Sequence, residues 1–270
     1  MKPKSKVLII AGSDSSGGAG IQADIKTVTA FGSYAMTAVT AVTSQNTKGV
    51  KEIISIPIKS LKTQLTMVLD DIGANAVKIG MLHKIDIIKC VHKILKEYKL
   101  KNVVLDPVMI AKGGAKLVNK NSINYLKKLL LPLCDVVTPN IPEAEVFTGL
   151  SIKNKEDMIK AAKKIIGMGA KNVLLKGGHL KNKMIFDILV SKKDIKVFPK
   201  RKINTKNTHG TGCTLSSALA TCLSQKKNIY KSCKTSLQYV DQAIITAPGY
   251  GKGFGPLNHL VSLNLKNIDA

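Results

Sequence analysis

The chain is poor in the side chains that nucleic-acid-binding proteins use. It has no tryptophan, only 4% of its residues are aromatic, and Arg201 is its only arginine. Arginine reads bases with a bidentate fork and aromatic rings stack on bases, whereas lysine supplies only a point charge. The formal net charge of +25 comes from lysines scattered along the predicted helices. We therefore expect no nucleic-acid partner, although this charge favours anionic ligands.

The chain also lacks long apolar segments and paired cysteines. Its apolar runs, such as Lys6 to Ala11, end well short of the roughly 20 residues that cross a membrane. The opening Met-Lys-Pro-Lys leads into such a run without the apolar core of a signal peptide. Five cysteines, odd in number and without a C-x-x-C pair, argue against a disulfide framework or a zinc knuckle. We expect a cytoplasmic protein without membrane contact.

Short apolar runs alternate with segments of helical period along the whole chain, which is typical of parallel strands buried on both faces. Because no linker separates two cores, we predict one three-layer α/β domain over residues 1–270, with a mostly parallel central sheet. Met184 to Val190 and Ile195 to Phe198 predict a late antiparallel hairpin. The other predicted strands are Val7 to Ala11, Met36 to Val42, Ala76 to Ile79, Val103 to Asp106, Asp135 to Thr138 and Val173 to Lys176. The predicted helices are Gly20 to Ala30, Leu61 to Asp71, Ile85 to Tyr98, Ser122 to Leu131, Lys155 to Gly167, Gly212 to Ser224 and Ile229 to Thr246.

A glycine-rich segment, Ala11 to Gly20, follows the first predicted strand, at the edge of the sheet where ligands bind. Its glycines allow close approach of backbone to a ligand, but they lack the G-x-G-x-x-G spacing of a dinucleotide fingerprint. The segment alone is as consistent with a tight structural turn as with a binding site. Asp24, one helical turn past Gly20, either faces the same crevice or is an exposed helix carboxylate, which is the commoner case.

A second glycine turn, Asn207 to Thr214, leads into a helix of small residues. The amides of Gly210, Thr211, Gly212 and Cys213 would have no partners within the helix. Together with the helix dipole, they would form an anion hole suited to a transferring phosphoryl group. Since no G-x-x-x-x-G-K-[ST] loop occurs in the chain, this turn is the best phosphate cradle that the sequence offers.

Cys213 lies in the first turn of that helix, where the dipole lowers the pKa of a thiol below its free value of about 8.5. This makes Cys213 a candidate general base, and a small buried packing residue is the alternative. The other four cysteines have no such setting. His209, just before the turn, would either contact phosphate or pack as a polar group.

Polar residues follow three of the predicted strands directly. Asp106 follows one strand, Asn140 and Glu143 follow the next, and Lys176 ends another. A nucleotide-dependent kinase needs oxygen ligands for hydrated Mg²⁺ and a cation near the phosphates, which these residues would supply. Asp-Pro and Pro-Asn are also ordinary turn dipeptides, so the joint position of the residues is the signal.

Seven segments carry a resemblance that spans nearly the whole chain in order. They are AGSDSSGGAGIQAD, TAVTSQNTKGV, VKIGML, VVLDPVM-AK, TPNIPEAE, VLLKGGHL and NTHGTGCTLSSALA. Together they closely resemble the hydroxymethylpyrimidine/phosphomethylpyrimidine kinases, which are ribokinase-like α/β/α proteins. The resemblance implies an enzyme that uses ATP and Mg²⁺ to phosphorylate 4-amino-5-hydroxymethyl-2-methylpyrimidine and then its monophosphate, giving the diphosphate for thiamine biosynthesis.

The resemblance also implies which residues bind the pyrimidine. Gln45 would hydrogen-bond the ring, since an amide offers both a donor and an acceptor to an aminopyrimidine edge. Asp24 and the backbone at Gly12 would lie at the same pocket. Met81 would pack against the ring, with an ordinary core methionine as the alternative.

The implied phosphoryl-transfer residues lie at the second glycine turn and at the strand ends. Cys213 falls where many ribokinase-like kinases have a catalytic aspartate, behind the anion hole of Gly210 to Gly212. Asp106 and Glu143 would hold Mg²⁺, through water. The residues implied in binding ATP and Mg²⁺ are Asp106, Asn140, Glu143, Lys176 and Thr208.

The sequence departs from the family pattern at three positions. Ser15 stands where proline is frequent, Gly113 where serine is frequent, and Lys252 where histidine is common. None of the three is a residue to which we assign chemistry. The glycine at position 113 adds backbone freedom to a loop that closes over phosphates, so lid behaviour is the property that the departures affect.

Two other functions fit the same residues. A pyridoxal or pyridoxine kinase on this scaffold would act on another flat heteroaromatic alcohol of similar size. A non-catalytic protein that retains the fold would bind ATP without transferring phosphate. The family also leads us to expect a homodimer.

Overall fold

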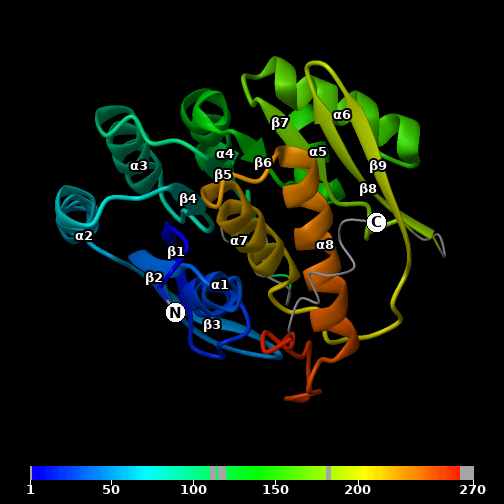
Figure 1. Cartoon of the computed structure of the whole chain (residues 1–270), viewed down its shortest axis with the longest axis horizontal. Coiled ribbons are helices and arrows are strands. Elements are labelled where there is room, and N and C mark those ends of the chain that lie inside the picture. Colours follow the sequence, from blue (N-terminus) through cyan, green and yellow to red (C-terminus); the bar gives the residue numbers. More distant parts are fainter. Residues whose placement is uncertain (1, 110–113, 115–119, 181–183, 262–270) are drawn as a thin grey trace.

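The computed structural model describes residues 2–109, 114, 120–180 and 184–261, so Gly113 lies outside the described residues. The described residues form one nine-stranded sheet in the order β3-β2-β1-β4-β5-β6-β7-β8-β9, with helices on both faces (Figure 1). The strands are β1 Lys6–Asp14, β2 Tyr34–Asn46, β3 Gly49–Ser55, β4 Ala76–Ile79, β5 Val103–Leu105, β6 Val136–Val137, β7 Asn172–Leu175, β8 Met184–Ser191 and β9 Ile195–Arg201. The helices are α1 Gly20–Ala30, α2 Ile58–Asp71, α3 Ile85–Glu97, α4 Lys120–Tyr125, α5 Ile141–Thr148, α6 Lys155–Gly167, α7 Thr211–Ser224 and α8 Ile229–Ile245.

The sheet is parallel in its centre and antiparallel at both edges. β1 pairs in parallel with β2 and β4, and the parallel pairing continues through β5 and β6 to β7. β3 is antiparallel to β2, and β8 is antiparallel to both β7 and β9. The predicted α/β class, the mostly parallel sheet and the late hairpin are confirmed.

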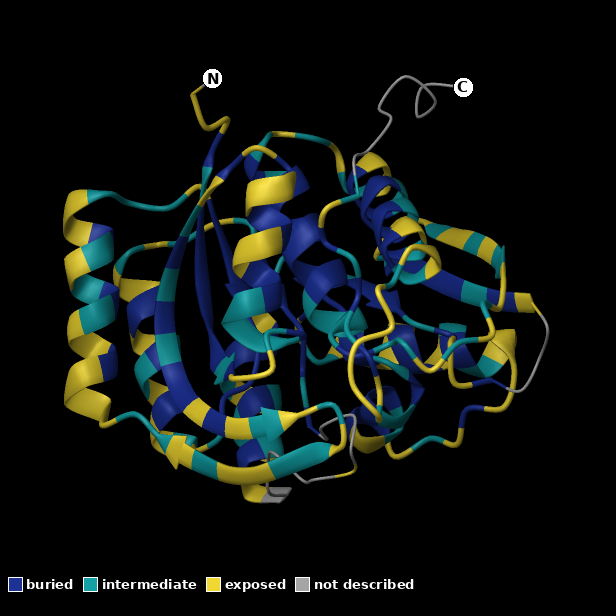
Figure 2. Cartoon of the chain, turned by 90° about the horizontal axis from the view of Figure 1, so that it is seen from below, coloured by how far each residue is buried: buried dark blue, intermediate teal, exposed yellow. Residues whose placement is uncertain are grey.

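Successive side chains of a central strand point into two different cores, because the period of a strand is two. In β1, Leu8 and Ile10 pack with α2, α3, α5 and α6, whereas Val7 and Ile9 pack with α1, α7 and α8. Figure 2 shows these strands buried between helices whose outer faces are exposed. A strand covered on both faces has no polar alternation, which explains the continuous apolar runs in the sequence.

Three elements differ from the prediction. β3 was not predicted, because none of its residues is fully buried and it lies at the edge of the sheet. α5 was not predicted, although Pro142 lies in its first turn, where proline's missing N–H costs nothing. The helix predicted from Ser122 to Leu131 is divided, since α4 passes into a π-helical turn at Leu126–Leu130 and a 3-10 turn at Leu131–Leu133.

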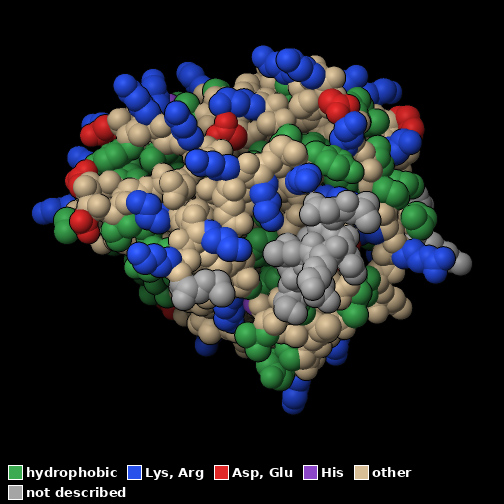
Figure 3. All heavy atoms as spheres, in the orientation of Figure 1, with side chains coloured by type: hydrophobic (Ala, Val, Ile, Leu, Met, Phe, Trp, Pro, Cys, Tyr) green, Lys and Arg blue, Asp and Glu red, His purple; other side chains and the backbone are tan. Residues whose placement is uncertain are grey.

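The lysine excess lies on the surface. Figure 3 shows Lys and Arg side chains spread over the whole drawn face, interspersed with other side chains and not gathered into one stripe. This distribution on the drawn face agrees with the scatter of lysines in the sequence. Within the described part of the chain, no helix has both the length and the apolar character that a bilayer crossing requires.

Candidate active site

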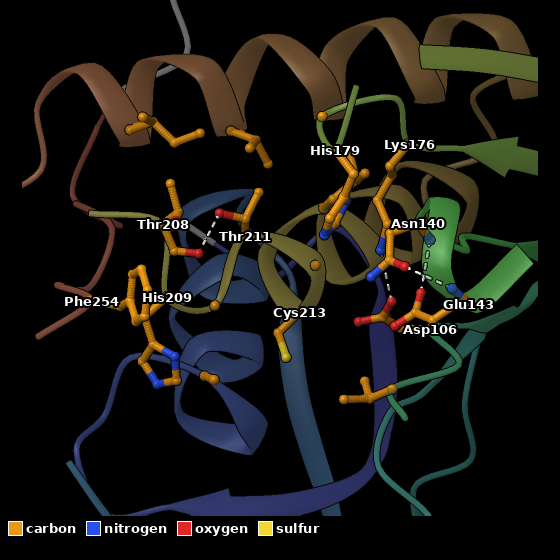
Figure 4. Close-up of a pocket in the computed structure, with 18 of the residues that line it drawn as sticks. Asp106, Asn140, Glu143, Lys176, His179, Thr208, His209, Thr211, Cys213 and Phe254 are labelled. Atoms are coloured by element: carbon orange, nitrogen blue, oxygen red, sulfur yellow. Dashed lines mark hydrogen bonds and ion pairs between the residues drawn. The ribbon is translucent and has the colours of Figure 1, made fainter. Parts of the chain in front are cut away.

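The parallel strands and the start of α7 border one cavity of about 810 Å³. Figure 4 shows Cys213 pointing into it, between the side that holds His209 and the side that holds Asp106. Every residue predicted for the site lines this cavity, except Asp24. Those that line it are Gly12, Gln45, Met81, Asp106, Asn140, Glu143, Lys176, Thr208, Gly210, Thr211, Gly212 and Cys213.

The two glycine-rich turns pack directly against each other at the start of α7. Gly210 has a left-handed backbone with φ of 84°, and a Cβ on it would overlap the carbonyl oxygen of Gly18. A Cβ on Gly18 would in turn overlap the ring of His209. Both positions therefore need glycine, one for its conformation and both for the close approach of backbone.

This arrangement leaves backbone amides open at the start of α7. The first bond within the helix runs from the Thr214 amide to the Gly210 carbonyl at 2.9 Å. The Thr211 amide reaches the Thr208 carbonyl only at 3.4 Å. In the described part of the chain the amides of Gly212 and Cys213 have no acceptor. These amides and the helix dipole form a site for an anionic oxygen.

Asp14 joins the two turns. One of its carboxylate oxygens accepts hydrogen bonds from the Ala19 amide at 2.8 Å and from His209 Nε2 at 2.7 Å. The other oxygen accepts from the amide of Ser16 at 2.8 Å and from its hydroxyl at 2.7 Å. Both Asp14 and His209 are buried. Of the two roles left open for His209, the structure shows polar packing within the turn.

Ser15, where the sequence departs from the family, holds the backbone of Gln45. Its hydroxyl donates to the Gln45 carbonyl at 2.8 Å and accepts from the Gln45 amide at 2.9 Å. The Gln45 side chain accepts from the Thr43 hydroxyl at 3.1 Å and lies against His209. A proline at position 15 has no hydroxyl for these bonds, so the departure adds two hydrogen bonds that hold the backbone of Gln45 at the cavity wall. Lys252, the third departure, is exposed.

Asp24 does not reach the cavity, and both interpretations of it from the sequence were wrong. Its carboxylate is completely buried between α1, β4 and α7. It accepts a hydrogen bond from Lys78 Nζ at 2.7 Å and another from the Ser217 hydroxyl at 2.7 Å. Burial raises the pKa of Asp24, and the Lys78 charge opposes this rise. Neither Lys78 nor Ser217 was recognised from the sequence.

The pKa of Cys213 also differs from the prediction. Burial raises it from the ordinary 9.0 to about 12, while the Lys78 charge opposes the rise and the charges of Asp24 and Asp106 add to it. The sulfur does face the cavity, as the sequence predicted. At neutral pH, however, the free enzyme holds a thiol and not a thiolate, because loss of solvent outweighs the helix dipole.

Asp106, Glu143 and Lys176 form a cluster on the side of the cavity away from His209 (Figure 4). Lys176 Nζ lies 3.1 Å from Asp106 Oδ1. Asn140 caps α5, since its side-chain oxygen accepts from the Glu143 amide at 2.9 Å and its own amide donates to Glu143 Oε2 at 2.8 Å. Asn140 therefore holds Glu143 in place at the cavity.

The cluster has more negative than positive charge. Burial raises the pKa of Glu143 to about 7, the Lys176 charge opposes this rise, and the Asp106 charge adds to it. Hydrated Mg²⁺ would supply the missing positive charge, and carboxylate oxygens are ligands that it prefers. No direct cage of three His, Cys, Asp or Glu side chains occurs among the described residues. The donor set thus fits a metal that keeps most of its water and phosphate ligands.

A family model for phosphomethylpyrimidine kinase matches residues 14–258, which include most of the residues that line this cavity. The chain belongs to the phosphomethylpyrimidine kinase family. The predicted family and the predicted class, a phosphotransferase, are confirmed. The alternative of a non-catalytic protein is set aside.

Two relatives and one solved structure are similar to this chain over most of its length. The hydroxymethylpyrimidine/phosphomethylpyrimidine kinase of Bacillus subtilis is 44% identical over 94% of each chain. A thiamine biosynthesis bifunctional protein of Geobacter sulfurreducens is 46% identical over 96% of this chain, which spans about half (53%) of that protein's length. The ADP complex of Bacillus subtilis pyridoxal kinase has a TM-score of 0.88 and 38% identity, covering 94% of this chain and 97% of its own.

The first prediction concerns the contact between the glycine turns. Gly210→Ala should lower kcat about 100-fold or more, because the new Cβ pushes the turn away from Gly18 and misplaces the amides of the anion hole. Turnover is measured by product mass, and folding by circular dichroism and the midpoint of thermal unfolding. Gly167→Ala is the control, since no atom lies within 4 Å of a Cβ there. A folded Gly210→Ala variant with normal kcat would contradict the assignment of the anion hole.

The second prediction concerns acid stability. Burial raises the pKa of Asp14, but hydrogen bonds from His209 and Ser16 outweigh burial and hold the pKa at about 2, below the ordinary 3.8. A depressed pKa in the folded state contributes stability that is present above pH 4 and lost as the pH falls toward 2. Between pH 5 and pH 2, the free energy of unfolding of the wild type should therefore fall by about 2 kcal/mol more than that of Asp14→Asn.

This difference is measured by denaturant unfolding at a series of pH values. Asp71→Asn, at an exposed position at the end of α2, is the control and should follow the wild type. Parallel curves for the wild type and Asp14→Asn would show that the bond to His209 contributes nothing to acid stability.

Proposed function

We propose that this enzyme uses ATP and Mg²⁺ to phosphorylate 4-amino-5-hydroxymethyl-2-methylpyrimidine, and then its monophosphate, in one cavity. The observation that carries the proposal is the pair of open amides of Gly212 and Cys213 beside Lys176 and Asp106. A Cβ on Gly212 would lie 3.0 Å from Asp106 Oδ2 and 3.3 Å from Lys176 Nζ, so the start of α7 lies directly next to this ion pair. Hydrogen-bond donors and a lysine thus lie close together at the place where a transferring phosphoryl group would bind. Positioning and charge of this kind supply most of the rate in phosphoryl transfer.

The acceptor would occupy the side of the cavity next to Gln45. A Cβ on Gly12 would lie 2.5 Å from the Met81 methyl, so the bare backbone at Gly12 and the thioether make a narrow apolar surface. A flat ring fits such a surface, and the Gln45 amide offers a donor and an acceptor at its edge. Both features suit an aminopyrimidine.

The nucleotide would extend from the anion hole toward α8. The cavity wall there combines apolar side chains with Lys202 and Thr208. In the similar Bacillus subtilis pyridoxal kinase the bound nucleotide is ADP, which supports ATP as the donor. Mg²⁺ bound near Asp106 and Glu143 would neutralise phosphate charge as the terminal phosphoryl group leaves.

In the first transfer, the hydroxymethyl oxygen forms a bond to the γ-phosphorus as the bond to the bridging oxygen breaks, and the acceptor proton passes to the Cys213 thiolate. In the second transfer the acceptor is a phosphate whose second pKa is about 6, so it is already ionised and needs little help from a base. The two steps therefore make different demands on Cys213.

This difference gives the third prediction. Cys213→Ala should slow phosphorylation of the alcohol at least about tenfold more than phosphorylation of the monophosphate. With the pKa of Cys213 near 12, the thiolate fraction rises tenfold per pH unit across the neutral and alkaline range. Alcohol turnover in the wild type should rise with pH accordingly, whereas monophosphate turnover should be nearly flat above pH 7.

The measurement follows both product masses from pH 6 to pH 9 with separate substrates. Cys90→Ala is the matched control, because Cys90 lies outside the cavity. An equal loss in both steps would reject the base role of Cys213 while leaving the kinase assignment intact.

A pyridoxal kinase is the second candidate function, since a solved pyridoxal kinase shares the fold with a TM-score of 0.88. Paired turnover assays with ATP and either pyridoxal or the pyrimidine alcohol separate the two. We expect a higher kcat/KM with the pyrimidine, and a preference for pyridoxal would reverse the order of the candidates.

We also propose a homodimer. Val42 and Ile54 pair with each other across β2 and β3 and are 43% and 56% exposed, which supports an apolar contact on this edge of the sheet. Light scattering should give the mass of two chains for the wild type and a lower mass for Ile54→Lys. A monomeric wild type would reject the proposal.

A further inference from the structure

Lys78 is a charged residue inside an apolar strand. β4 reads Ala-Val-Lys-Ile, and all four residues are buried, with Lys78 at 0% exposure. Desolvating an ammonium group is costly, and apolar replacement of a buried ion pair is often neutral or stabilising. Stability of the fold therefore does not account for this lysine.

Lys78 is held in place by two helices. Its partner Asp24 lies on α1, and Asp24 also accepts a hydrogen bond from Ser217 on α7. Ser217 follows Cys213 by four residues, which places it one turn further along the same face of α7. The ion pair is thus tied to the helix that carries Cys213.

Lys78 also lines the cavity, as Cys213 does. A Cβ on Gly80 would lie 2.9 Å from Lys78 Nζ and 3.0 Å from the methyl of Ala11, so the glycine keeps this space open. The ammonium group therefore lies close to Gly80, out of contact with solvent.

The charges that face Cys213 come from several elements and have both signs. The positive groups oppose the effect of burial on the thiol, and the negative groups add to it. The Gly20 amide acts in the same direction as the positive groups. The charged groups are Lys78 of β4, Asp24 of α1, Asp106 after β5 and Lys176 after β7.

We propose that Lys78, oriented by Asp24, is the buried countercharge that stabilises the thiolate form of Cys213. The thiolate is the form that takes the proton from the hydroxymethyl oxygen of the substrate. Lys78 is a positioning residue that acts through Cys213 and keeps its own proton throughout. This inference rests on the proposed base role of Cys213. The acceptor proton moves from the hydroxymethyl oxygen to the sulfur, and no proton passes to the ion pair.

Two substitutions with opposite electrostatic effects test the proposal. Lys78→Met removes the positive charge and should make the thiolate harder to form, whereas Asp24→Asn removes the negative charge and should make it easier. Iodoacetamide alkylates only the thiolate. At a given pH below 10, alkylation of Cys213 should be about tenfold slower in Lys78→Met and about tenfold faster in Asp24→Asn, which is the effect of a change of one unit in thiol pKa.

The rate is measured from pH 7 to pH 11 by the mass of the peptide that contains Cys213, which separates it from the other cysteines. Lys78→Met/Asp24→Leu removes both charges without leaving one unpaired, so it should fold even where Lys78→Met does not, with a rate between those of the single variants. Lys171→Met, in the exposed pair with Asp135, is the control and should alkylate Cys213 like the wild type.

A merely structural ion pair would change both single variants in the same direction or change neither, and either result overturns the proposal. The base role of Cys213 is judged separately, by the turnover of Cys213→Ala with the two substrates. Opposite alkylation shifts together with equal loss in both transfers would support the Lys78 countercharge and reject the base. Unchanged alkylation in the Lys78 and Asp24 variants, together with a selective loss of alcohol phosphorylation in Cys213→Ala, would reject the Lys78 countercharge and support the base.

Discussion

The geometry of the site depends on the contact between two glycine turns that are far apart in the sequence. Gly210 packs on the carbonyl of Gly18 where no side chain fits, and His209 bonds to Asp14 across 195 residues at the same junction. This junction joins the end of β1 to the start of α7. Because it fixes the direction from which the chain enters α7, the first amides of the helix face the cavity.

Charge around the cavity is arranged in two parts. The cluster at Asp106 and Glu143 carries excess negative charge with one lysine, which suits a divalent cation and phosphates bound together. Between β4 and α1, the completely buried side chains of Lys78 and Asp24 form an ion pair that solvent does not screen. The first part serves ligands directly, whereas the second acts on the Cys213 thiol at the anion hole.

Much of the fold was predictable because local rules and tertiary packing agree. The bounds of α1, α6 and β4 match the prediction residue for residue, since each is marked by an apolar pattern with clear ends. β3 and α5 were missed because edge position and a proline-containing first turn give weak local signals. Among the predicted site residues, those that follow strands or open α7 line one cavity, because topology brings strand ends together. Asp24 was misplaced, since its partner Lys78 is 54 residues away and appears in the sequence only as one charge within an apolar run.

The pKa of Cys213 shows why position on a helix was not enough. The dipole at a helix start contributes about 0.3–1 kcal/mol, and up to about 2 kcal/mol in partly buried settings. A rise in thiol pKa from 9.0 to about 12 corresponds to about 4 kcal/mol against the thiolate. Desolvation therefore outweighs the dipole, even though the charge of Lys78 opposes the rise. Only tertiary structure reveals that a lysine from β4 lies close enough to Cys213 to act on its thiol.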